Sequence, residues 1–174
     1  MFLQETYEIE DLLYYNDGTS LSGITYPTGV TATNENGAIK ITGTTSGEKS
    51  IFYPPEFTTS SNFSYEVETV TGGTTNPIAI IIKTGSTANG MWCAYATSNN
   101  RYDYGFGGSS GNYSTSFKAG DKLRVVRENG TTKLYLNDYL MKSATHSLAG
   151  TFQVGHYTNS GRTQYIKNVK IKPL

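Results

Sequence analysis

Aromatic and polar side chains are interleaved through residues 92–113, and this combination suits sugar recognition. A sugar ring has an apolar CH face, on which flat aromatic rings stack, and a rim of hydroxyl groups, which amide, carboxylate and guanidinium groups bind. Tyr157, in a later predicted loop, adds a further aromatic ring. We therefore predict a ligand-binding set made of Trp92, Tyr95, Asn100, Arg101, Tyr102, Asp103, Tyr104 and Tyr157.

Strand alternation divides this set between two faces, because successive side chains of a strand point in opposite directions. Trp92 shares a face with Ala94 and Ala96, opposite Cys93 and Tyr95, and Tyr102, Tyr104 and Phe106 lie opposite Arg101 and Asp103. At most one set of each strand can face a ligand. The alternative is that Trp92 and most of the tyrosines form core, and that Arg101 and Asp103 form a solvated or cross-strand pair.

Metal and thiol chemistry have little support. The two histidines, His146 and His156, are ten positions apart, and the pattern contains no HExxH or EF-hand motif, so we predict no metal and no cofactor. Cys93 is the only cysteine, which excludes an intrachain disulfide. It lies in an apolar run, and we interpret it as an inert buried thiol rather than a nucleophile paired with a histidine.

The length favours a single domain spanning residues 1–174, and the charged residues balance to no net charge. Fourteen basic and 14 acidic residues give a formal net charge of +0, which argues against a nucleic-acid partner. No apolar run approaches the length of a membrane span, so we predict no membrane insertion. The first residues lack the basic and apolar segments of an export signal.

The strongest structural signal is the stretch 117–142. Asn129-Gly130 predicts a two-residue hairpin with a type I′ turn, since both central residues need positive φ. The resulting register pairs Leu123 with Leu136 and Val125 with Leu134 on one apolar face. Arg124 and Tyr135 then lie on the opposite face, as secondary candidates for ligand contact. Asn137-Asp138 predicts a second turn, followed by a third strand.

The remaining chain also predicts strands, about a dozen in all, separated by turns and without a convincing helix. Residues 63–70 alternate with Phe63, Tyr65 and Val67 inward, and the apolar run 78–82 predicts a central strand covered on both faces. Residues 107–111 are interpreted as a flexible tip. Residues 5–15 read as a strand or a short helix, and we favour an edge strand that pairs with the last strand. The fold class is therefore all-β.

Two motifs resemble concanavalin A-like (laminin G-like) jelly-roll domains. One is the hairpin Leu134-Tyr-Leu-Asn137 following Asn129-Gly130, although Asp138 stands where that family commonly has glycine. The other is the closing stretch Ile166-Lys-Asn-Val-Lys-Ile171. The resemblance covers about residues 50–174, and it implies a concanavalin A-like β-sandwich of two antiparallel sheets.

The resemblance also implies a function class, a non-catalytic carbohydrate-binding module with a glycan partner. Similar modules rich in Thr, Ser, Asn, Tyr and Gly occur on phage and virus tails. We therefore expect a receptor-binding or accessory adhesion domain at a virion or extracellular surface. The alternative is a structural or protein-interaction domain of such an assembly, with a virion partner or copies of itself as a homo-oligomer.

Catalysis is not expected. The β-glucan-cleaving enzymes of this fold carry a run of alternating carboxylates, and a retaining pair lies about 5–5.5 Å apart. Glu66 and Glu68 share a face, but the central aspartate and the third carboxylate of that run are missing. Asp11 and Asp17 lie where some related modules hold a structural calcium, although two acidic residues beside a turn are usually solvated.

Overall fold

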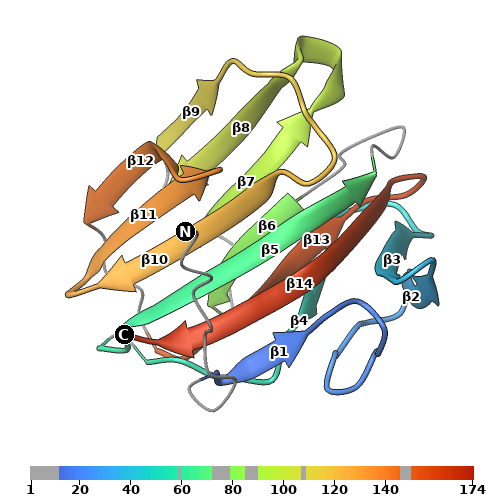
Figure 1. Ribbon diagram of the computed structural model, residues 1–174, viewed down its shortest axis with the longest axis horizontal. Coiled ribbons are helices and arrows are strands. Elements are labelled where there is room, and N and C mark those ends of the chain that lie inside the picture. The colour runs from blue at the N-terminus through green and yellow to red at the C-terminus, as the bar shows by residue number, and fades with distance from the viewer. Residues whose placement is uncertain (1–11, 59, 72–78, 85–89, 107–108, 146–149) are drawn as a thin grey trace, which may run out of the picture.

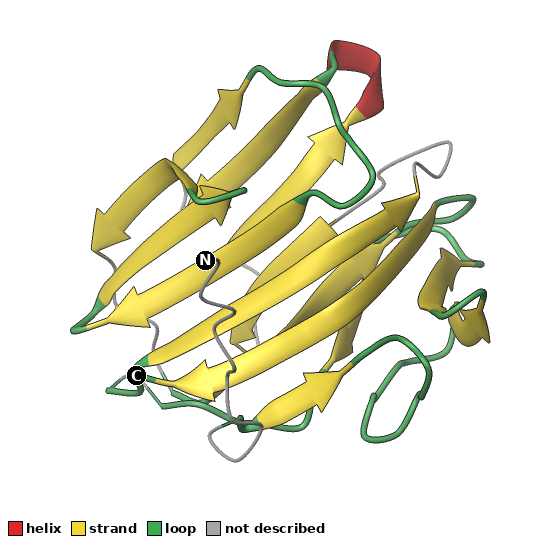
Figure 2. Cartoon of the chain, in the orientation of Figure 1, coloured by secondary structure: helices red, strands yellow, loops and turns green. Residues whose placement is uncertain are grey.

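The protein is a β-sandwich of two antiparallel sheets, seen in a computed structural model that describes residues 12–58, 60–71, 79–84, 90–106, 109–145 and 150–174 (Figures 1 and 2). One sheet runs in the order β12 (Tyr139–Thr145), β11 (Thr131–Leu136), β10 (Lys122–Glu128), β5 (Phe63–Thr71), β14 (Thr163–Pro173), β3 (Ala38–Gly43) and β2 (Val30–Glu35), with β1 (Tyr14–Asn16) also paired to β14. We call it the eight-stranded sheet.

The second sheet runs in the order β4 (Lys49–Phe52), β13 (Phe152–Thr158), β6 (Ala79–Thr84), β7 (Met91–Ala96), β8 (Arg101–Phe106) and β9 (Ser109–Tyr113). We call it the six-stranded sheet. A 3-10 turn at Thr97–Asn99 joins β7 to β8, and the described residues contain no α-helix (Figure 2). No described helix is long and apolar enough to cross a membrane.

The predicted hairpin is confirmed in turn and register. Asn129 and Gly130 have φ of 49° and 76°, as a type I′ turn requires. Leu123 pairs with Leu136 and Val125 with Leu134, and all four side chains are buried. The second turn is also confirmed, since Asn137 and Asp138 have φ of 48° and 68°. Aspartate tolerates this left-handed conformation, which explains how Asp138 can stand where the similar jelly-roll domains commonly have glycine.

Other strand predictions are also confirmed within the described residues. Phe63, Tyr65 and Val67 are fully buried on the inner face of β5. Ile80, Ile81 and Ile82 of β6 are buried on both faces, between β13 and β7. Of the edge strand predicted over residues 5–15, only Tyr14 and Tyr15 are confirmed, in β1, which pairs with β14; Leu12 and Leu13 precede the strand, and residues 5–11 lie outside the described residues. The prediction of a flexible tip at 107–111 is wrong for residues 109–111, which belong to β9.

The core between the sheets contains a small polar cluster. The Tyr65 hydroxyl lies 3.1 Å from the Gly155 carbonyl oxygen and 3.0 Å from His156 Nε2, and all three residues are buried. The hydroxyl satisfies both partners when it donates to the carbonyl and accepts from a protonated Nε2. Burial raises the pKa of Tyr65 well above its usual value, so this hydroxyl keeps its proton.

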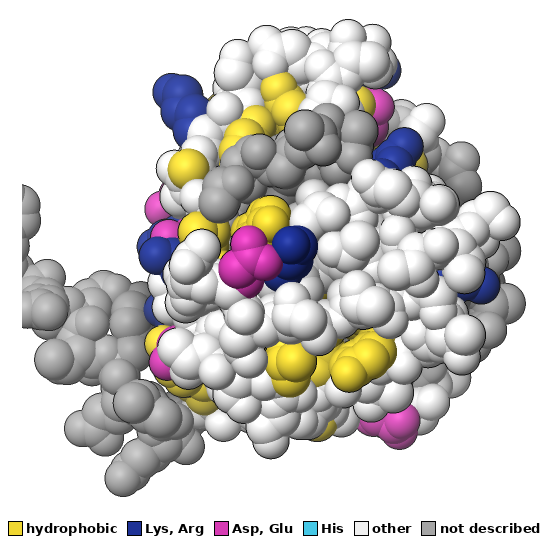
Figure 3. Space-filling model, turned by 90° about the vertical axis from the view of Figure 1, so that its right-hand side faces the viewer, with side chains coloured by type: hydrophobic (Ala, Val, Ile, Leu, Met, Phe, Trp, Pro, Cys, Tyr) yellow, Lys and Arg dark blue, Asp and Glu magenta, His cyan; other side chains and the backbone are white. Residues whose placement is uncertain are grey.

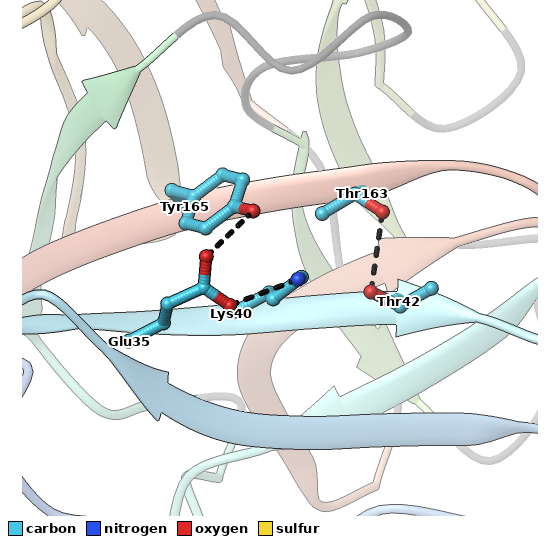
Figure 4. A network of polar contacts seen from close by, with 5 residues as sticks. All are labelled: Glu35, Lys40, Thr42, Thr163 and Tyr165. Atoms are coloured by element: carbon cyan, nitrogen blue, oxygen red, sulfur yellow. Dashed lines mark hydrogen bonds and ion pairs between the residues drawn. The ribbon is translucent and has the colours of Figure 1, made fainter.

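A second polar network lies across β2, β3 and β14 (Figure 4). Lys40 Nζ donates to Glu35 Oε2 at 2.9 Å, the Tyr165 hydroxyl donates to Glu35 Oε1 at 3.3 Å, and Thr42 and Thr163 hydroxyls lie 3.1 Å apart. The hydrogen bond from Lys40 holds the pKa of Glu35 below its usual value. On this side of the molecule, charged side chains lie singly or in small groups on an otherwise uncharged surface (Figure 3).

Cys93 is buried on the inner face of β7, as the sequence predicts. Burial raises the pKa of its thiol, and the charge of Asp103 adds to this effect. Because the thiolate is the reactive form, we expect no measurable labelling of the native protein by a thiol reagent within the time that a free thiol reacts fully. Labelling should become complete in denaturant. Prompt labelling of the native protein would contradict the burial of Cys93.

Candidate functional site

Three of the predicted site tyrosines point into the core. Tyr95, Tyr102 and Tyr104 lie on the inner face of the six-stranded sheet and are nearly or fully buried. The Tyr102 hydroxyl donates to Asp121 Oδ2 at 3.0 Å, and Asp121 also accepts from the Lys118 backbone N–H at 2.8 Å. The hydroxyl of Tyr102 thus anchors the segment before β10. This burial corrects the prediction, and these three tyrosines are not part of the site.

Asn100 serves the turn between β7 and β8. Its φ of 48° is left-handed, which asparagine tolerates, and its backbone N–H donates to the Thr97 carbonyl. Its Oδ1 accepts from the Tyr95 hydroxyl, and its Nδ2 donates to Ser116 Oγ at 2.9 Å. All these contacts hold the loop together, so Asn100 positions the ends of both strands rather than presenting free donors.

Trp92, Arg101 and Asp103 lie together on the outer face of the six-stranded sheet. The register pairs Trp92 with Gly105, Ala94 with Asp103 and Ala96 with Arg101. Asp103 is therefore the diagonal neighbour of Trp92, within reach of a large side chain. The structure thus brings three predicted site residues together and places Trp92 outside the core, half-buried. We call Trp92, Arg101, Asp103 and Tyr157 the outer-face cluster.

The indole of Trp92 lies over Gly105. A Cβ atom at position 105 would overlap Nε1, Cδ1 and Cε2 of the indole. Glycine on β8 therefore lets the ring approach the strand backbone closely. On the β6 side, Trp92 pairs with the buried Ile81. The indole is packed against the sheet yet partly open to solvent, which is the arrangement a stacking platform needs.

Arg101 and Asp103 form an ion pair two positions apart on β8. Arg101 Nε lies 2.6 Å from Asp103 Oδ1, and the side chains keep 36% and 28% of their surface exposed. The predicted pairing of Arg101 with Asp103 is therefore correct, and the pair is a partly solvated one within a single strand rather than a cross-strand one. The pair fixes the orientation of both charged groups beside Trp92 while leaving them open to solvent.

Tyr157, on β13, lies at the border of the cluster. It belongs to a strand, not to the loop in which the sequence placed it. Burial raises the pKa of its hydroxyl well above the usual value. Tyr157 alternates along β13 with His156, which faces the core, so its side chain lies on the outer face of the six-stranded sheet. Tyr157 is half-buried, and β6 separates its strand from β7 and β8.

Sequence reasoning missed two polar residues beside the cluster. Asn112 of β9 pairs with Asp103, and Ser110 pairs with Gly105, so both side chains share the outer face. Both are exposed. The alternation of side chains along residues 109–113 could have revealed this strand, but its serine and glycine residues show no alternation of apolar and polar side chains.

The carboxylates considered for catalysis lie on the outer face of the other sheet. Glu66 Oε2 is 3.9 Å from Arg124 Nε, and Glu68 Oε1 is 3.4 Å from Lys167 Nζ. Asn168 Nδ2 also donates to Glu68 Oε2 at 2.9 Å. Each carboxylate is thus held by a side chain of a neighbouring strand.

The secondary candidates Arg124 and Tyr135 lie on that same face. The Arg124 guanidinium is 4.5 Å from the centre of the Tyr135 ring, and its Nη2 is 2.8 Å from Asp138 Oδ1. The cation therefore already covers the ring that a sugar would need. This contact makes the pair a weaker candidate than the outer-face cluster.

A metal site finds no support in the part of the chain that the structure describes, where no three His, Cys, Asp or Glu side chains gather. Asp17 is exposed and accepts hydrogen bonds from the backbone and hydroxyl of Thr19, at 2.8 and 2.6 Å. These bonds hold the pKa of Asp17 below its usual value. Asp11, the other residue considered for calcium, lies outside the described residues.

Comparison with solved structures identifies the fold. The carbohydrate-binding module CBM66 from Bacillus subtilis superposes with a TM-score of 0.60 at 20% identity, over 86% of this chain and 95% of that chain. A lectin from Bauhinia forficata in complex with GalNAc gives 0.62 at 14% identity, over 92% and 97%. The fold is a concanavalin A-like β-sandwich.

Enzymes share this architecture. The Crh5 transglycosylase superposes with a TM-score of 0.70 at 11% identity, over 91% of this chain and 83% of that chain. No protein-family model matches the sequence, and no curated protein matches it either. At these identities the superpositions establish the fold alone, and function must be argued from the side chains.

Proposed function

We propose that the protein is a non-catalytic carbohydrate-binding module that binds a glycan on the outer face of the six-stranded sheet. The observation that carries this proposal is the juxtaposition of the Trp92 indole with the Arg101–Asp103 pair. It combines an aromatic platform with charged hydrogen-bonding groups, the two elements that a sugar ring requires. Asn112 on β9 and Tyr157 on β13 lie on the same face of the sheet, on either side of these strands.

Solved structures of the same fold support the class of ligand. A carbohydrate-binding module and a lectin bound to GalNAc share the fold. A transglycosylase shares the fold as well, so the proposal that this protein is not an enzyme rests on its own carboxylate residues. Within the described residues, Glu66 and Glu68 come nearest to the alternating carboxylates of the β-glucan-cleaving enzymes, and cations or an amide hold both of them.

A role as receptor-binding or adhesion domain at a virion or extracellular surface belongs to the same proposal. It is supported by the composition alone, which is poor in charge and rich in Thr, Ser, Asn and Tyr. A protein-interaction domain is the alternative, and its support is the exposed pair Tyr139 and Leu140 on the edge strand β12. Exposed apolar side chains of this kind are typical of contact surfaces when they gather into a large patch.

A glycan microarray probed with the full chain separates these functions. We expect saturable binding to a restricted group of glycans. Light scattering at the same protein concentration gives the oligomeric state. If the protein binds none of the arrayed glycans and forms a stable trimer or higher oligomer, the carbohydrate-binding proposal is contradicted and the interaction domain is favoured. Glycan cleavage that disappears in Glu66→Gln or Glu68→Gln would overturn the assignment as a non-enzyme.

A further inference from the structure

The contact between Arg101 and Asp103 uses only part of the guanidinium group and only one oxygen of the carboxylate. Arg101 reaches Asp103 Oδ1 through Nε, not through the fork of its two Nη atoms. Among the described residues, neither Asp103 Oδ2 nor the Nη atoms of Arg101 has a hydrogen-bond partner. A carboxylate acceptor and guanidinium donors therefore remain open side by side on an exposed surface.

We propose that the outer-face cluster binds neutral glycans through two adjacent hydroxyls of one sugar ring, shared between Asp103 and Arg101. One hydroxyl donates to Asp103 Oδ2, and its neighbour accepts from an Nη of Arg101. Hydrogen bonds to charged groups are roughly twice as strong as neutral ones, so this pairing supplies the directional part of binding. The inference rests on the proposed function and names the class of ligand for that site.

Trp92 determines which part of the sugar meets the pair. Asp103 is its diagonal neighbour on the adjacent strand, and Gly105 holds the indole close to the sheet. A ring stacked on the indole by its CH face presents its equatorial hydroxyls sideways, along the surface of the sheet. These are the groups that the diagonal neighbour can reach.

Charge balance selects neutral over acidic sugars. The positive charge of Arg101 is compensated by Asp103 at 2.6 Å. The pair itself thus offers no excess positive charge to a uronate or sulfate group, and the Asp103 carboxylate would repel it.

The test compares neutral polysaccharides (mannan, galactan and laminarin) with the acidic polysaccharides polygalacturonate and hyaluronate, by calorimetric titration of the full chain. We expect binding only among the neutral probes, with an affinity that changes little between low and physiological salt. For the oligosaccharide unit of the polymer that binds, removing or methylating one hydroxyl of the contacted pair should lower affinity at least about tenfold.

Two substitutions locate the contact. Asp103→Asn removes the charged acceptor and should lower affinity for the neutral probe about tenfold. Arg101→Lys should lower it as well, since an ammonium group lacks the planar fork. The matched control is Glu35→Gln, which removes a carboxylate from a comparable ion pair on β2, at the other sheet. It should leave binding unchanged.

Binding of an acidic probe that weakens steeply with salt, and that Asp103→Asn strengthens, would overturn the neutral-ligand inference while leaving the proposed function standing. Neutral binding unaffected by both substitutions at positions 101 and 103 would also overturn it. Absence of binding to every probe and to the whole microarray would remove the proposed function together with the inference.

Discussion

Replacing Trp92 with alanine is expected to weaken glycan binding by about 30-fold, the largest effect of any single substitution in the outer-face cluster. Aromatic side chains at the centre of a binding surface commonly contribute about 2 kcal/mol, which corresponds to that factor in affinity. Trp92 meets this description because it lies on the outer face, between Ile81 and Gly105, with Asp103 as its diagonal neighbour. Calorimetric titration with a glycan identified on the microarray measures the change.

Tyr135→Ala is the matched control for Trp92→Ala. It removes a half-exposed aromatic ring from the outer face of the opposite sheet, where Arg124 covers it. We expect unchanged affinity in this variant. A loss of affinity in Tyr135→Ala with none in Trp92→Ala would move the site to the eight-stranded sheet. Urea unfolding of both variants separates binding effects from loss of folded protein.

The substitution Gly155→Ala is expected to have the largest effect on stability. Gly155 lies on β13 opposite Phe52, and a Cβ atom there would overlap the carbonyl oxygen of Ile51 in β4. Relief requires β13 and β4 to separate, because the obstacle is backbone and not a flexible side chain. Overpacking of this kind costs about 1–3 kcal/mol, and the carbonyl of Gly155 also accepts from Tyr65 in the core.

Gly37→Ala provides the comparison for Gly155→Ala. Gly37 has a φ of 73°, but its Cβ would meet no atom within 4 Å. Alanine at this position lowers the free energy of unfolding only through backbone strain, by about 1 kcal/mol. Urea unfolding should therefore show a larger shift of the midpoint for Gly155→Ala than for Gly37→Ala. Equal shifts would mean that the approach of β13 to β4 is looser than the structure shows.

The fold could be predicted from local signals that act independently. Asn129-Gly130 determines its own turn, because few residue pairs adopt two positive φ angles, and the turn then sets the register of β10 and β11. The alternation of β5 was equally informative, since Phe63 and Tyr65 occupy one face and Glu66 the other. The all-β class follows from such patterns, and the two-sheet sandwich follows from the resemblance to concanavalin A-like domains.

The site could be predicted only in part. Alternation separated Trp92 from Tyr95, and Arg101 from Tyr102, but aromatic residues occupy both faces, so hydrophobicity did not reveal which face is inside. The burial of the three tyrosines depends on partners far along the chain, such as Asp121 for Tyr102. Strand β9 was missed because its residues have weak β propensity. Its extended conformation depends on backbone pairing with β8, which the local sequence does not reveal.

Intrinsic fluorescence tests the central claim most directly, because Trp92 is the only tryptophan of the chain and lies in the proposed site. Titration with a glycan that binds should shift or quench the emission along a saturable curve, with the same dissociation constant as calorimetry. It should also protect the indole from quenching by acrylamide. A glycan that binds by calorimetry and leaves both the emission and the quenching of Trp92 unchanged would contradict the assignment of the site to the outer face of the six-stranded sheet.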